Sequence, residues 1–377
     1  MARDDDPNHV PRMHPDEVDV DERLVRTLLA DHLPDPTLPD PTLSDPTLPD
    51  LAGLPLRRVT AWGTDHVIFR LGDELSVRLP KVGWADGQGE REQRWLRALA
   101  PRLGVDVPVP VALGRPGAGY PFRWYVTPWI DGTHPDPDDG AALPALAEEL
   151  AEFVLALRAC PTDGAPAVRP GRRGGPLAAA DEPTRTAAER LRAMVRDPEA
   201  FPGLAPDDVD ALTACWQDGV DAPAWDGTPV WVHGDLSDGN LLRRDGRLAG
   251  VIDWSGLAVG DPAVELMCAW HLFDGPSRQV LRTALDVDDD TWRRGRAWAV
   301  SAALQALPYY RDTNPDIVDR SLRTARAVLG TEGCTTTSRV EIPTGEPPRA
   351  GITRRERRRM PDRGPRPPAG STCTGPG

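Results

Sequence analysis

The chain has 377 residues, more than a single domain usually holds, so we expect two packed units with a substantial core. Its formal net charge of −14 argues against nucleic acid as a partner and mildly favours cationic ligands. No apolar run reaches the roughly 18 residues of a membrane span, and the N-terminus lacks the features of a signal peptide. The sequence therefore predicts a cytoplasmic protein, without membrane contact, that is a monomer or a homodimer.

The N-terminal region begins with three segments of different character. Residues 1–17 are expected to form a flexible N-terminus, and apolar residues then recur at helical intervals up to Leu33, which indicates an amphipathic helix. A five-residue repeat of the PDPTL type occupies residues 34–50, where frequent proline blocks both helix and central strand. We interpret this repeat as a disordered insert.

Strand patterns follow the repeat. The runs VTAW, VIFRLG and ELSVRLP between Val59 and Pro80 predict strands, and a Gly72–Asp73 turn joins the last two. A helix is expected over residues 90–103, with further strands near 107–113 and 124–132. Residues 18–127 should therefore form a small lobe with an antiparallel sheet.

Helical periodicity dominates residues 135–330, so that residues 128–134 become a hinge between two lobes. After Gly330 the periodicity ends. Residues 331–377 contain more Arg residues than Asp and Glu residues combined, and they are also rich in Pro and Gly. This composition predicts a disordered basic tail. The predicted fold class is α+β, with a small N-terminal lobe built on an antiparallel sheet and a larger helical C-terminal lobe.

The stretch WVHGDLSDGNLL, residues 231–242, sets polar side chains between two apolar strands. Its second strand and the later run LAGVID form a hairpin around Asp245 and Gly246. This pairing brings Asn240 close to Asp253 at one end of the hairpin, with Asp235 on the loop just before it.

Oxygen-bearing side chains at one edge suit Mg²⁺, which usually takes one or two protein carboxylates and leaves its other positions to water and phosphate oxygens. A kinase also needs a carboxylate that orients the acceptor hydroxyl and takes its proton, and Asp235 is placed for that role. Each of these residues alone is typical of a turn cap. Their combination in this order favours a phosphotransferase site.

HGDLSDGN followed by VIDW resembles the aminoglycoside phosphotransferase family, whose fold is similar to that of protein kinases. The resemblance implies Asp235 as catalytic base and Asn240 and Asp253 as Mg²⁺ ligands, in an enzyme that phosphorylates a hydroxyl group with ATP or GTP. His233 belongs to the same motif, either with a direct part in the chemistry or as a support that hydrogen-bonds the loop backbone. In the following GDPAVEL, Glu265 replaces the family's usual Asp, and its contribution stays open.

A kinase also needs a cation for the nucleotide phosphates and an acid that holds this cation. On the strand ELSVRLP, Arg78 points away from the apolar face. Many members of the family that this chain resembles have arginine at this position. On the following helix Glu92 repeats with apolar residues, so it should face inward. A buried glutamate without a partner is costly, and we therefore expect Arg78 and Glu92 to pair.

The resemblance also implies a hinge in WYVTPWIDG, where backbone groups near Pro128, Trp129 and Ile130 would hold adenine. WGTDHV (62–67) occupies the place of the loop that covers the phosphates, although a plain hairpin turn fits it nearly as well. The sequence contains no GxxxxGK[ST], HExxH or GxSxG motif of other enzyme classes. The rival hypothesis is a nucleotide-binding protein without turnover.

The expected acceptor is a small molecule with a hydroxyl group. The segment DGTHPDPDDG (131–140) carries four acids that would attract a cation, which makes an aminoglycoside-like or other aminated acceptor the first expectation. These acids are Asp131, Asp136, Asp138 and Asp139. A neutral macrolide-like acceptor would instead need an apolar pocket, and an amino alcohol or another metabolite is a further alternative. The candidate residues for such a pocket are Trp270, Leu272, Phe273, Tyr309 and Tyr310.

Overall fold

The computed structural model describes residues 12–31, 50–59 and 64–331. Most of the PDPTL repeat, the tail after Thr331, and Trp62 and Gly63 of the expected phosphate-covering loop therefore lie outside the described residues.

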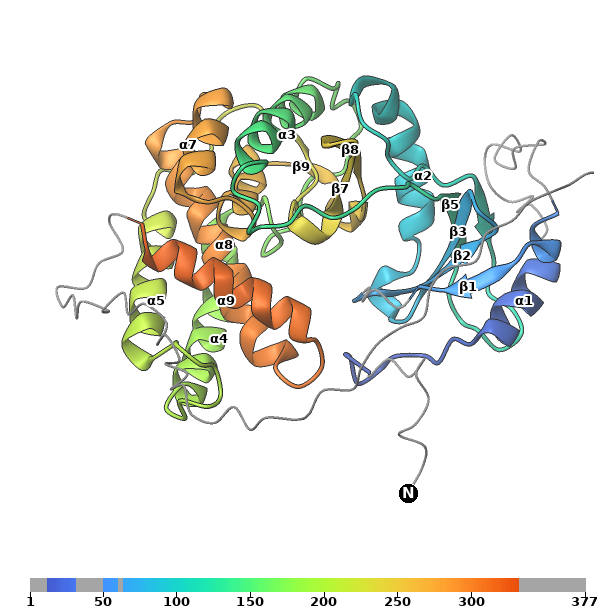
Figure 1. The fold of residues 1–377 in the computed structure, drawn as a ribbon, viewed down its shortest axis with the longest axis horizontal. Helices are drawn as coiled ribbons and strands as arrows, with labels where there is room; N and C mark the ends of the chain where they lie inside the picture. The colour runs from blue at the N-terminus through green and yellow to red at the C-terminus, as the bar shows by residue number, and fades with distance from the viewer. Residues whose placement is uncertain (1–11, 32–49, 60–63, 332–377) are drawn as a thin grey trace, which may run out of the picture. The chain divides into compact units, whose positions relative to one another are not determined.

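The N-terminal lobe contains a five-stranded antiparallel sheet of order β1-β2-β3-β5-β4 (Figure 1). The strands are β1 (Leu56–Arg58), β2 (His66–Leu71), β3 (Leu75–Pro80), β4 (Ala112–Gly114) and β5 (Trp124–Pro128). The expected β2–β3 hairpin is present, and its turn uses Gly72 at a φ of 62°. Strand β1 ends at Arg58, and residues 60–62 of the predicted strand VTAW lie outside the described residues.

Side chains along β3 point alternately to the two faces of this sheet, which differ in polarity. Val77 and Leu79 are buried in a core shared with helix α1 (Glu22–Ala30), which begins at the capping residue Asp21. Arg78 points to the opposite face, in register with Tyr125 of β5. Helix α2 (Gln88–Leu99) covers Tyr125 closely, because a Cβ on Gly89 would lie 2.6 Å from that ring. The sheet therefore separates a hydrophobic face from one that carries charge.

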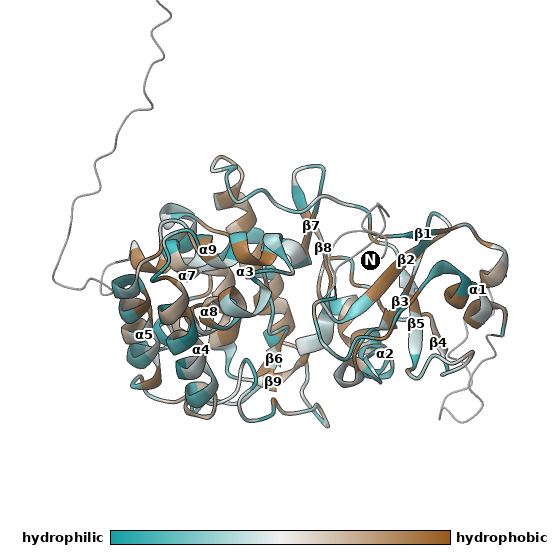
Figure 2. Ribbon diagram, turned by 90° about the horizontal axis from the view of Figure 1, so that it is seen from below, coloured by the Kyte–Doolittle hydropathy of each residue, from teal (hydrophilic) through white to brown (hydrophobic). Residues whose placement is uncertain are grey.

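The C-terminal lobe is built around helix α8, which packs against α4, α5 and α9 (Figure 1). Its helices are α3 (Leu143–Arg158), α4 (Asp181–Met194), α5 (Pro206–Val220), α6 (Cys268–His271), α7 (Gly275–Ala284), α8 (Asp289–Tyr310) and α9 (Pro315–Leu329). Hydrophilic and hydrophobic residues both occur along α4 and α5, as expected for helices with one buried face (Figure 2). No helix among the described residues is both long and apolar enough to cross a membrane.

Two short antiparallel pairs insert into this helical lobe. Strand β6 (Val230–Val232) pairs with β9 (Ala258–Gly260), and β7 (Leu241–Arg244) pairs with β8 (Arg247–Val251). Asp245 and Gly246 both have positive φ between β7 and β8, as a two-residue hairpin turn of type I′ requires. The predicted hairpin around these two residues is therefore confirmed.

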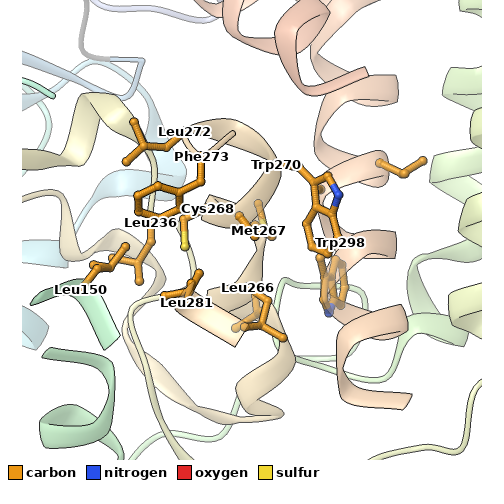
Figure 3. Packing of buried hydrophobic residues seen from close by; sticks show 14 of the residues in the cluster. Leu150, Leu236, Leu266, Met267, Cys268, Trp270, Leu272, Phe273, Leu281 and Trp298 are labelled. Carbon is orange, nitrogen blue, oxygen red and sulfur yellow. The ribbon is translucent and has the colours of Figure 1, made fainter. Parts of the chain in front are cut away.

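The described residues form two hydrophobic cores, one in each lobe. The core of the C-terminal lobe includes Leu236, Leu272 and Phe273, which are shown among its buried side chains in Figure 3. It also takes in Leu96 and Leu99 from the far end of α2. The sheet-based lobe and the helical lobe confirm the predicted bilobal α+β class.

Residues 12–20 form a segment with a turn at 13–16 and no helix or strand, here called the N-terminal strap, that contacts both lobes. His14 is buried, and its Nδ1 lies 2.6 Å from Oη of Tyr309 at the end of α8. The other ring nitrogen, Nε2, lies 3.1 Å from the carbonyl oxygen of Thr64 in the N-terminal lobe. Glu17 forms a buried ion pair of 3.2 Å with Lys81 just after β3. Residues 12–17, which the sequence assigns to a flexible N-terminus, thus include two buried, paired side chains.

Candidate active site

The polar loop of the HGD motif begins where β6 ends. Gly234 adopts a φ of 78°, and a Cβ there would lie 3.3 Å from the carbonyl oxygen of Gly256, so glycine suits this sharp turn. Leu236 is fully buried and anchors the loop in the hydrophobic core. Between these two residues the side chain of Asp235 remains 36% exposed. Leu236 therefore fixes the loop on the hydrophobic core, while the carboxylate of Asp235 stays accessible to solvent.

Asp235 is oriented by an amide and by a guanidinium. Asn240 donates from Nδ2 to the carbonyl oxygen of Asp235 at 2.8 Å and to its Oδ2 at 3.3 Å. Arg173 forms an ion pair with Oδ1 of the same carboxylate. Burial raises the pKa of the Asp235 carboxyl, but the nearby charges, that of Arg173 first, lower it below its ordinary value. Asp235 is therefore a carboxylate at neutral pH.

The buried side chain of His233 connects the HGD loop to the residue after β8 through hydrogen bonds. Its Nε2 lies 3.0 Å from the carbonyl oxygen of Ile252, and its Nδ1 accepts the backbone N–H of Asp235 at 3.2 Å. These partners fit a neutral ring protonated on Nε2, and burial lowers the pKa of this imidazole. The ring also packs edge-on against Trp254. This geometry matches the supporting role considered for His233 and offers no path to an acceptor.

Glu265 holds the backbone of the same loop. This residue is 1% exposed, and its Oε1 accepts the backbone N–H groups of His233 and, at 3.4 Å, of Gly234. Burial raises the pKa of its carboxyl to about 7. The sequence flagged Glu265 only as a departure from a family pattern. Its contacts make it a positioning residue for the turn that carries Asp235.

Asn240 and Asp253 lie next to each other across the open end of the β7–β8 hairpin. The backbone N–H of Ile252 donates to the carbonyl oxygen of Asn240 at 2.9 Å, which sets Asp253 one residue further on. Asp253 has φ 59° and ψ 75°, a left-handed conformation that is uncommon for a residue other than glycine and is found at functional sites. The predicted proximity of these two residues is thus observed in the backbone.

The chemistry of these two side chains fits Mg²⁺. Because Asn240 donates through Nδ2 to Asp235, its Oδ1 is the atom left for coordination. No three His, Cys, Asp or Glu side chains of the described residues gather into a metal site. One carboxylate and one amide oxygen match an ion that keeps water and phosphate oxygens as its other ligands. The charge of Asp253 also helps burial to raise the pKa of Asp65, a nearby acid that the sequence did not indicate.

Arg78 and Glu92 are both buried on the α2 side of the sheet, as predicted. No ion pair within 4 Å joins these two described residues; Glu92 instead accepts from Nε2 of Gln88 at 2.6 Å, and its Oε2 has no partner. Burial raises the pKa of Glu92 to about 7 although the charge of Arg78 lowers it. Burial also lowers the pKa of Arg78, but Tyr125, Glu92 and Asp253 together raise it above its ordinary value. Arg78 and Glu92 thus shift each other's pKa although they form no direct contact.

The hinge backbone has fewer free donors than expected. Pro128 has no N–H, and the N–H of Trp129 donates to the carbonyl oxygen of Glu74 at 2.7 Å. The indole of Trp129 donates to Asp131, and its ring lies 4.7 Å from the guanidinium carbon of Arg70. Of the three residues predicted to hold adenine, Ile130 is thus the one whose N–H makes no backbone hydrogen bond within the described ranges.

Arg173 is a further residue of this site that the sequence did not indicate. It lies in the loop GRRGG at 171–175, whose Gly174 has a φ of 84° and accepts the N–H of Asp261 at 2.8 Å. Asp261 in turn forms a buried ion pair of 2.8 Å with Arg294. This anchoring brings the loop to the catalytic motif. The two arginines between glycines were the available signal, but they do not indicate which carboxylate they meet.

Of the two sets of residues proposed for the acceptor, one member, Tyr310, lies near the HGD loop. Burial raises the pKa of its hydroxyl, and the charges of Asp65 and Asp235 raise it further. The four acids of the 131–140 segment are exposed, and Asp131 lies 3.5 Å from Arg70 of the N-terminal lobe. Of the apolar set, Trp270, Leu272 and Phe273 are fully packed in the core shown in Figure 3. Tyr309 is half exposed and contacts the N-terminal strap.

Comparisons with known proteins bear on the fold and the family of the chain. The chain is similar to the GDP and kanamycin complex of APH(2")-IIia, with 21% identity and a TM-score of 0.55, over 76% of this chain and 96% of that one. It is also similar to the GDP complex of wild-type aminoglycoside 2'-phosphotransferase-IIIa, with 21% identity and a TM-score of 0.53, over 73% and 92% of the two chains. At this identity the likeness shows a shared fold. No curated protein matches the chain.

The sequence profile of the phosphotransferase enzyme family matches residues 57–298, which is more than half of the chain. This match includes the sheet, the hinge and the whole HGD and VIDW region, and it confirms the resemblance inferred from those motifs. The chain belongs to the phosphotransferase enzyme family.

Proposed function

We propose that the protein transfers the γ-phosphoryl group of ATP or GTP to a hydroxyl group of a small molecule. The observation that carries this proposal is the arrangement of Asp235, a partly exposed carboxylate held by Asn240, next to the adjacent pair Asn240 and Asp253. Both structural neighbours named above contain GDP, which supports a nucleotide as phosphoryl donor.

In the proposed reaction Asp235 accepts the proton of the acceptor hydroxyl. The acceptor oxygen forms a bond to the γ-phosphorus, the bond from this phosphorus to the β-γ bridging oxygen breaks, and the nucleoside diphosphate leaves. Mg²⁺, held by Asn240 and Asp253, would neutralise charge on the phosphates. Arg78 would contact these phosphates from the N-terminal lobe, with its charge maintained by Glu92.

The loop around Asp235 is prepared for this task by its supports. Asn240 fixes the direction of the carboxylate, and His233 and Glu265 hold the loop backbone from the buried side. The carboxylate therefore loses little conformational freedom when an acceptor binds, which favours the reaction. A protein that only binds nucleotide has no need for a buried support of this kind.

The aminated acceptor expected from the four acids is not part of this proposal. Those acids are exposed, and the charged groups that lower the pKa of Asp235 are arginine and histidine side chains, with Arg173 first. The macrolide-like alternative loses support as well, because three of its five candidate side chains are core residues.

The test is nucleoside diphosphate release by purified Asp235→Asn protein across a broad acceptor panel. The amide can still orient a hydroxyl but cannot take its proton, so turnover should fall by about 10² to 10⁴-fold while nucleotide binding stays nearly unchanged. Asp245→Asn is the matched control, because it removes one exposed carboxylate and asparagine suits the type I′ turn. A near wild-type rate in Asp235→Asn would remove Asp235 from the mechanism.

A further inference from the structure

Three guanidinium groups flank the acceptor side of the HGD loop. Arg173 pairs with Asp235, and Arg320 and Arg323 of helix α9 both pair with Asp238, three residues along the same loop. We call these three residues the arginine cluster. Two carboxylates face three guanidinium groups, so the cluster leaves one positive charge in excess.

Arg320 lies against the HGD loop, and the charges of Arg173 and Arg320 both act on the same buried histidine, His271. A Cβ on Gly239 would lie 2.6 Å from Nη2 of Arg320, so this glycine gives the guanidinium room beside the loop. His271 is buried, with Nδ1 2.8 Å from Oγ1 of Thr324 on α9. Burial, with Arg173 and Arg320, lowers the pKa of His271 to about 4, so this ring adds no charge of its own at neutral pH.

Arg173 stands where an acceptor hydroxyl has to arrive. Asn240 donates to one oxygen of Asp235 and Arg173 to the other. Each carboxylate oxygen has two lone pairs, so a hydroxyl can donate to the same carboxylate and then lies beside the guanidinium of Arg173. A substituent next to this hydroxyl therefore meets the guanidinium of Arg173, whose side chain is 42% exposed and has donors left for a second anionic partner. A carboxylate or phosphate group can accept two parallel hydrogen bonds from it.

We propose, on the basis of the function proposed above, that the acceptor carries an anionic group beside the reacting hydroxyl and that Arg173 binds this group. Arg173 then contacts both Asp235 and the anion of the acceptor, and it holds the acceptor hydroxyl beside the base. A polycationic acceptor would instead bring ammonium groups toward three guanidinium groups. The structure therefore favours hydroxy acids or phosphorylated hydroxyl compounds over aminated ones.

The first experiment tests the anion site without requiring turnover. Sulfate binding is measured by calorimetry in the presence of saturating Mg·ADP, so that the nucleotide site is filled. We expect binding to the wild type, at least tenfold weaker binding to Arg173→Gln, and intermediate binding to Arg173→Lys, which keeps the charge but not the paired donors. Arg172→Gln is the control, because this neighbouring arginine is exposed. Sulfate binding that does not depend on Arg173 would overturn the proposal.

The second experiment distinguishes the chemical sources of the anion. Nucleoside diphosphate release is measured at pH 6.5, where the amine of glucosamine is protonated, with glucosamine, glucose, glucuronate and glucose 1-phosphate, which share a ring and differ in charge. We expect turnover with an anionic member, and a KM for it that rises at least tenfold in Arg173→Gln with a smaller change in kcat. Turnover restricted to glucosamine, or a KM that Arg173→Gln leaves unchanged, would contradict the proposal. Loss of all nucleotide turnover with intact sulfate binding would count against the proposed function alone.

Discussion

Glu92 offers a test of how burial without a full partner affects stability. The native pKa of this carboxyl is raised from 4.5 to about 7 by burial, and Glu92 is 1% exposed. One pH unit of difference corresponds to about 1.36 kcal/mol, so ionising Glu92 in the folded protein costs about 3 kcal/mol relative to the unfolded chain.

The sign follows from proton binding. Between pH 4.5 and about 7 the unfolded chain releases a proton from Glu92 that the native protein still holds. The Glu92 contribution to stability is therefore fully present below pH 4.5, falls as the pH rises through this window, and is constant above it. Glu92→Gln removes this dependence, and its amide oxygen can still accept from Gln88.

The assay is denaturant unfolding of wild type and Glu92→Gln at several pH values from 4.5 to 8. The difference in free energy of unfolding between the two proteins should change by about 3 kcal/mol across the range in favour of the variant. Comparing differences cancels any constant cost of the buried amide. Glu148→Gln, on an exposed position of α3, controls for the loss of one negative charge. A difference that stays constant with pH would refute the reasoning.

Three further predictions concern the site and its supports. Asp253→Asn keeps a side chain that tolerates the left-handed backbone but removes the charge, so Mg²⁺-dependent nucleotide binding should weaken in calorimetry, and unchanged metal dependence would contradict the assignment. Glu265→Ala leaves two buried loop N–H groups without an acceptor, so kcat should fall while Glu265→Gln retains most activity; equal kinetics of the two variants would rule out the positioning role. His14→Ala removes two hydrogen bonds of the strap and should lower the free energy of unfolding by about 2 kcal/mol, whereas Arg12→Ala, which loses an exposed ion pair, should cost less than about 1 kcal/mol in the same denaturant series.

The backbone of the candidate site could be predicted from the sequence because it depends on local rules. Alternating apolar residues and an Asp–Gly turn determine the β7–β8 hairpin, and the hairpin brings Asn240 and Asp253 together. Periodicity likewise gave the faces of β3 and α2 from which Arg78 and Glu92 project. The absence of a direct contact between them depends on side-chain reach, which periodicity does not contain.

Contacts between distant segments were not predictable in the same way. Arg173 meets Asp235 across 62 positions of sequence, and the meeting depends on how Gly174 docks on Asp261. Nothing local distinguishes Arg173 from its exposed neighbour Arg172. The role of Glu265 was missed for the same reason, because its carboxylate acts on a loop 32 positions earlier.

The N-terminal strap has a consequence for the order in which the chain folds. His14 is synthesised 295 positions before its partner Tyr309. At roughly 5 to 20 residues per second, about 15 to 60 s pass before the second residue exists. The strands of the N-terminal lobe are close in sequence, so they can pair during this interval. The strap cannot contact α8 at this stage, because α8 has not yet been synthesised. Docking of the strap is therefore a late step of folding, and it takes place only after the helical lobe has been made.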